Sequence, residues 1–90
     1  MSEDRETRLK RLRLRSWRRG IREMDLILGG FADAELGGLS DAGLDAYERL
    51  LEEPDWDLYA WVAGQAESPD EHRAMVARLR ARSAFARSPP

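Results

Sequence analysis

The side chains of this 90-residue chain that could do chemistry are mostly charged. The chain has no cysteine and one histidine, His72, so thiol nucleophiles, disulfides, zinc–thiolate sites and histidine clusters are excluded. A serine–histidine–acid unit would depend on His72 alone. Because His72 falls in step with Val76 and Leu79 of an expected helix, we interpret it as a packing or surface residue. The sequence predicts no catalytic residue and no enzyme.

Four acids that lie close together could in principle hold a hard cation: Glu52, Glu53, Asp55 and Asp57. They lack the central glycine and the alternating ligand spacing of a calcium loop. Helix caps and partners for the helix dipole explain acids at these positions more simply. We therefore predict no metal site.

The run RRGIRE, residues 18–23, is unusual because a glycine stands inside a basic helical pattern. Glycine in a helix interior costs about 1 kcal/mol relative to alanine. Gly20 would permit a change of chain direction and a close approach by a neighbouring helix or a partner. Arg19 and Glu23 are four residues apart and could pair on one helical face. The alternatives are a helix junction with a surface ion pair, and a docking site.

Charge is strongly segregated although the net charge is only −2. Basic residues dominate positions 1–22, acidic residues dominate 23–71, and arginine returns after position 72. The ends could neutralise the middle within the fold, or the basic segment could serve an external partner. Arginines around Trp17 would suit phosphate contact and base stacking, but a pI of about 5.4 is low for a nucleic-acid-binding domain.

The elements that must position these residues are helices. Apolar residues at alternating steps of three and four form one stripe: Leu14, Trp17, Ile21, Met24, Leu28 and Phe31. We expect one helix at about 5–18 and another at about 21–34, with Gly29 and Gly30 weakening the end of the second and Gly37-Gly38 ending the segment.

Three more helices are expected in the second half. Ser40 is a good N-cap for about 41–52, with Leu44, Tyr47 and Leu51 facing inward. Asp55 would cap about 56–64, with Leu58, Trp61 and Val62 inward and Gly64 closing it. Ser68, Pro69 and Glu71 match a capping box for a last helix to about 84, with Met75, Val76 and Leu79 inward. The prediction is an all-α protein, a compact bundle of about five short helices in a single domain over 1–90, with frayed tails at 1–6 and 85–90.

Two runs in this order resemble the family of succinate dehydrogenase FAD assembly factors. The family's RGxxE motif matches Arg19, Gly20 and Glu23, and its second pattern matches Leu50-Leu51-Glu52 followed by Asp57-Leu58-Tyr59-x-Trp61. The similarity extends from about residue 8 to 84.

The resemblance implies a helical factor that binds the flavoprotein subunit of succinate dehydrogenase, and of related fumarate reductases, and promotes covalent attachment of FAD to it. It places partner binding at Arg19, Gly20, Ile21, Arg22 and Glu23. No cofactor would be bound stably by the factor itself, because the bond-forming chemistry belongs to the flavin and its target.

We further expect a monomer in the bacterial cytoplasm, without nucleic-acid binding and without membrane insertion. The early acids Glu3, Asp4 and Glu6 argue against a transit peptide. The alternative function is a small basic-helix regulatory protein, antitoxin-like or nucleic-acid-binding.

Overall fold

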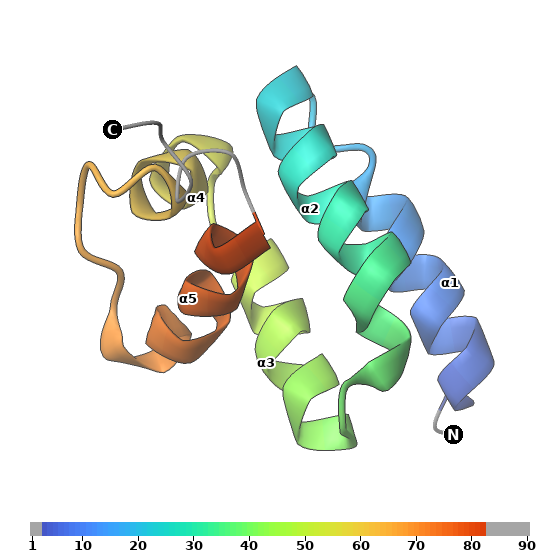
Figure 1. Ribbon diagram of the computed structural model, residues 1–90. Coiled ribbons are helices and arrows are strands. Elements are labelled where there is room, and N and C mark those ends of the chain that lie inside the picture. Colours follow the sequence, from blue (N-terminus) through green and yellow to red (C-terminus); the bar gives the residue numbers. More distant parts are fainter. Residues whose placement is uncertain (1–2, 83–90) are drawn as a thin grey trace.

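The computed structural model describes residues 3–82, which form a bundle of α-helices with no strand in that range (Figure 1). The elements are α1 (Arg5–Ser16), α2 (Arg22–Glu35), the 3₁₀ turn η1 (Leu36–Gly38), α3 (Asp41–Leu51), α4 (Asp55–Val62), the 3₁₀ turn η2 (Asp70–His72) and α5 (Arg73–Arg82). The prediction of five short helices is confirmed. The tail expected at 85–90 lies outside the described residues, whereas Asp4, expected to fray, accepts a hydrogen bond from the Thr7 N–H and caps α1.

The core forms from the apolar faces predicted for the last three helices. The buried side chains from α3, α4 and α5 are Leu44, Tyr47, Leu50, Leu51, Leu58, Trp61, Val62, Met75, Val76 and Leu79. They meet Met24, Leu28 and Phe31 of α2, and Phe31 stacks on Tyr47 with ring centroids 5.4 Å apart. Burial raises the pKa of the Tyr47 phenol to about 12, although its hydrogen bond with Ser16 acts in the opposite direction.

The first helix packs differently from the prediction. Leu14 and Trp17, expected in the core, are 51% and 39% exposed, whereas Leu12 and Ser16 are fully buried. The stripe was wrong here because the helix ends at Ser16, so the periodicity cannot continue through Trp17 to α2. Ser16 is satisfied in the core: its hydroxyl donates to the Leu12 carbonyl at 2.8 Å and lies 2.6 Å from the Tyr47 hydroxyl.

A series of ion pairs joins α1 to α3 along their length. In chain order the pairs are Arg5–Asp41, Arg8–Asp45, Arg8–Glu48, Arg11–Glu48 and Arg15–Glu52, at 2.6–3.1 Å. The offset between partners stays at 36 to 40 residues, so the two helices run parallel, as Figure 1 shows. A hydrogen bond from Arg11 lowers the pKa of the Glu48 carboxyl. The interpretation that the chain neutralises itself internally is thus confirmed for this face.

The expected caps and glycine breaks are only partly observed. Ser40 accepts from the Gly43 N–H and caps α3, and Gly64 has a φ of +79° directly after α4. The capping box at Ser68 is wrong, because the chain enters a 3₁₀ turn at Asp70 with no side-chain cap. The expected weakening by Gly29 is also wrong: α2 continues to Glu35, and the Trp17 ring occupies the space where a Cβ of Gly29 would lie.

Candidate functional site

Gly20 lies at the centre of a sharp turn between α1 and α2. Its φ of +98° belongs to the left-handed region that residues with a Cβ rarely adopt. Trp17 is the C-cap of α1, Ile21 precedes α2 in an extended conformation, and the Arg19 N–H donates to the Asp25 carboxylate at 2.7 Å. The turn is therefore fixed from the first turn of α2, and the prediction of two helices meeting at Gly20 is confirmed.

The Arg19 guanidinium points back into the protein. Its Nε donates to Asp55 Oδ1 at 2.7 Å, one terminal nitrogen donates to the Glu53 carbonyl at 2.6 Å, and the other donates to the Leu51 carbonyl. The Arg19 side chain is 12% exposed and that of Asp55 is 18% exposed. Asp55 is thus the ionic partner of Arg19. It does not cap α4, which has no side-chain cap. The predicted Arg19–Glu23 pair does not form.

The turn leaves other charged side chains on the surface. Arg18, Arg22 and Glu23 are exposed, and within residues 3–82 none of them has a hydrogen bond or ion pair through its side chain. Gly20 is itself exposed, and a Cβ added there would meet no atom within 4 Å. Ile21 is half-buried and packs against the core. The predicted site residues therefore divide into an inner support, Arg19, the half-buried Ile21, and an outward surface formed by Gly20, Arg22 and Glu23.

Two apolar residues are exposed that the sequence did not predict on the surface: Leu14, expected in the core, and Trp56. Trp56, at the start of α4, is 73% exposed, and Leu14 lies in a shallow groove between the end of α1 and the α3–α4 loop. The groove is lined by Leu14, Arg15, Arg18, Arg19, Pro54 and Asp55. Trp56 directly follows Asp55 in the sequence. The spacing of the residues does not show that Asp55 receives Arg19, so it could not show that Trp56 lies near this contact in the chain.

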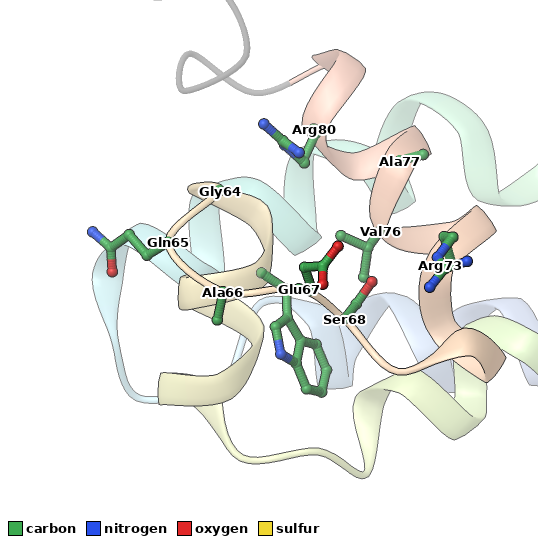
Figure 2. A pocket seen from close by; sticks show the side chains of 10 residues that line it. Gly64, Gln65, Ala66, Glu67, Ser68, Arg73, Val76, Ala77 and Arg80 are labelled. Carbon is green, nitrogen blue, oxygen red and sulfur yellow. The ribbon is translucent and has the colours of Figure 1, made fainter.

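A second cavity lies on the other side of α4, between the loop after Gly64 and α5 (Figure 2). The side chains around it come from Trp61, the 64–68 loop and one face of α5 that carries Arg73 and Arg80. Arg73 forms an ion pair with Asp70 at 2.6 Å, and Glu67 adds a negative charge to the lining. This mixture of charges defines no clear ligand.

His72 is buried, as the packing interpretation allowed, but it also makes a polar contact. Its Nε2 lies 2.7 Å from the Glu53 carboxylate, and its ring centroid is 5.7 Å from that of Trp61. Nδ1 of His72 is buried without a hydrogen-bond partner. Glu53 therefore contacts both the Arg19 guanidinium, through its carbonyl, and His72, through its carboxylate.

Most of the arginines that suggested nucleic-acid binding are occupied within the fold. Arg5, Arg8, Arg11 and Arg15 pair with acids of α3 or the residue after it, and Arg19 pairs with Asp55. In the last helix Arg78 and Arg82 pair with Glu35. The basic segment is consequently not a continuous cationic face. Among residues 3–82 no cluster of histidine and acidic side chains could hold a metal ion, and no helix there has the length and apolar character to span a membrane.

Comparison with known proteins places these features in a family. The family model described as "Flavinator of succinate dehydrogenase" matches residues 10–83, which include the Gly20 turn, the α3–α4 loop and His72. The chain belongs to this family.

Relatives carry the name "Succinate dehydrogenase assembly factor 2, mitochondrial". The protein of Meyerozyma guilliermondii is 54% identical over 60 residues, covering 67% of this chain and 44% of the relative. Those of Schizosaccharomyces pombe and Dictyostelium discoideum are each 39% identical, covering 80% and 78% of this chain and 52% and 50% of the relative. The chain thus spans about half the length of these relatives or less. The expected location in a bacterial cytoplasm is wrong by this comparison, because the relatives are named as mitochondrial proteins and come from eukaryotes.

Proposed function

We propose that this chain is an assembly factor that binds the flavoprotein subunit of succinate dehydrogenase and promotes covalent attachment of FAD to it. The observation that carries the proposal is the family match over residues 10–83. The names of the relatives support the same role. Within this role the chain acts as a chaperone and not as an enzyme.

The proposed docking surface is the outward side of the Gly20 turn. Gly20, Ile21, Arg22 and Glu23 would meet the partner, with Arg18 beside them. Exposed charges without internal partners can pair with complementary groups on another protein, which gives the contact its specificity. The missing side chain at Gly20 would let the partner's backbone approach closely. Arg19 would act from behind, because its hydrogen bonds to the α3–α4 loop hold the turn in place.

The same surface extends toward apolar side chains that a partner could cover. Leu14 shares a groove with Arg19 and Asp55, Trp56 directly follows Asp55 in the chain, and an exposed tryptophan is a frequent anchor at protein interfaces. The proposal gives these two residues the apolar part of the contact. The flavin would be held by the partner, whose own groups and the flavin ring carry the bond-forming chemistry.

Flavinylation of the partner tests the proposal directly. Apo-flavoprotein would be incubated with FAD, with or without this protein, and covalent flavin would be read by in-gel fluorescence after denaturation. We expect wild-type protein to accelerate covalent flavin formation, and Glu23→Ala to lower both flavoprotein binding and flavinylation.

Glu6→Ala is the matched control. Glu6 is also an exposed acid in the first turn of a helix, and its side chain makes no hydrogen bond or ion pair within residues 3–82. Both substitutions should change the free energy of unfolding by no more than about 0.5 kcal/mol. Equal flavinylation by the two variants would remove Glu23 from the docking surface. No acceleration by wild type would refute the function itself. Repeating the assay with a fumarate reductase flavoprotein tests whether that partner is also served.

A further inference from the structure

We infer that His72 and Glu53 are positioning residues for the Gly20 turn, although neither lies on the proposed docking surface. The inference rests on the proposed function only for its binding readout. Its structural part concerns this chain alone: a hydrogen-bonded chain of residues runs from η2, at the start of α5, through the α3–α4 loop to Arg19.

The first step is the chemistry of His72. An ionised carboxylate can only accept hydrogen bonds, so with Glu53 ionised Nε2 of His72 is the donor of the 2.7 Å contact. The His72 side chain is 2% exposed, and its Nδ1 has no partner. A buried polar atom without a partner lowers stability, and an apolar side chain of similar size would avoid that loss. What histidine adds at this position is therefore the bond to Glu53.

The second step is the position of Glu53 in the loop between α3 and α4. Arg19 binds three acceptors on alternate residues: the carbonyl of Leu51 at the end of α3, the carbonyl of Glu53 in the loop, and the carboxylate of Asp55 at the start of α4. Glu53 is the middle one. Its carboxylate, 32% exposed at the side chain, reaches across to η2, so the loop is held on one side by Arg19 and on the other by His72.

The third step links the loop to the turn. Arg19 precedes Gly20 directly, and its guanidinium can occupy its place only if the three acceptors keep their spacing. When the bond from His72 is lost, Glu53 becomes free to rotate and the loop can relax. The Arg19 Nε–H would then be less protected, and the outward surface at Gly20 would be less well ordered for a partner. Rigid placement of binding groups by residues behind them is a general requirement for tight binding.

Nuclear magnetic resonance of the Arg19 Nε–H tests the structural part without any partner. In His72→Leu we expect hydrogen exchange at this group to rise by about tenfold relative to wild type. His72→Gln should restore most of the protection, because its amide nitrogen can still donate to Glu53. Met75→Leu is the matched control: it alters a nearby buried residue of α5 whose side chain makes no hydrogen bond to Glu53, and it should leave the Arg19 signal unchanged.

Affinity for the succinate dehydrogenase flavoprotein, measured under conditions where every variant is folded, should fall by about tenfold in His72→Leu and recover in His72→Gln. If His72→Leu does not fold, Glu53→Ala tests the same link from its more exposed side. Unchanged Arg19 exchange in the folded variant overturns the inference, and so does unchanged affinity when exchange has risen. If wild type itself does not bind the flavoprotein, the proposed function fails, and the exchange data still decide the positioning role.

Discussion

Replacing Gly20 by alanine isolates the energy of the left-handed turn. A Cβ at this position would meet no atom within 4 Å beyond the two neighbouring residues of the chain, so contact with the rest of the protein contributes nothing. The loss comes from the φ of +98°, and a left-handed conformation costs a residue with a Cβ about 1–2 kcal/mol. Alanine also restricts the unfolded chain, which offsets up to about 1 kcal/mol. We expect a net loss of about 1 kcal/mol, or about 4–8 °C in melting temperature for a domain of this size.

The same chemical change at Gly30 is the matched control. Gly30 lies inside α2, has helical geometry, and also has open space where the methyl group of an alanine would lie. Alanine there should raise stability by about 1 kcal/mol, because it is the better helix former. At Gly29 a Cβ would lie 2.2 Å from the Trp17 ring, so Gly29→Ala must displace the indole and should be destabilising in spite of its helix propensity.

Urea unfolding followed by circular dichroism would rank the three variants. The expected order of stability is Gly30→Ala above wild type, and Gly20→Ala and Gly29→Ala below it. A Gly20→Ala protein as stable as wild type would refute the left-handed turn as the reason for glycine. Destabilisation by Gly30→Ala would show that α2 does not pass through this position as a regular helix.

Three further outcomes follow from the packing. Tyr47→Phe should cost about 1 kcal/mol in urea unfolding, because it removes the hydroxyl that contacts Ser16 and the Leu28 carbonyl, while flavoprotein binding stays unchanged. The pKa of the Glu48 carboxyl is lowered in the folded state. Its contribution to the free energy of unfolding is therefore fully present above pH 4.5, its ordinary pKa, and is lost as the pH falls through the lowered pKa. Glu48→Gln should therefore flatten the decline of stability with acid in a pH series of melts. Ser68→Ala should stay within about 0.5 kcal/mol of wild type in the same melts, since η2 has no side-chain cap, and a loss of about 1 kcal/mol would restore the capping box.

The sequence predicted those parts of the fold where apolar spacing and local caps act alone. The inward faces of α3, α4 and α5 follow helical periodicity, and Ser40 caps α3 through a hydroxyl three residues from its donor. The face of α1 could not be found in this way. It carries few apolar residues and is oriented by ion pairs with acids 36 to 40 residues later, which hydrophobic periodicity does not count.

The motif predicts that the site lies at the Gly20 turn, but it does not predict which of its side chains point inward and which lie on the surface. Arg19 and Glu23 have the spacing of a helical pair, yet the helix is interrupted at Gly20 and Arg19 finds better acceptors in the α3–α4 loop. Two of those acceptors are backbone carbonyls. Every residue has a carbonyl, so these acceptors cannot be recognised from the residue types. The same holds for the role of Asp55, whose position at the start of α4 suggested a cap.

The parallel arrangement of α1 and α3 also restricts how the length of this protein can vary. Arg5 donates to the Leu39 carbonyl just before α3, and Arg19 donates to the Glu53 carbonyl just after it, and each donor precedes its acceptor by 34 residues. The stretch from 5 to 19 therefore contains the same number of residues as the stretch from 39 to 53. An insertion or deletion in either stretch alone would leave one of the two arginines without its carbonyl. The two segments can lengthen or shorten only together.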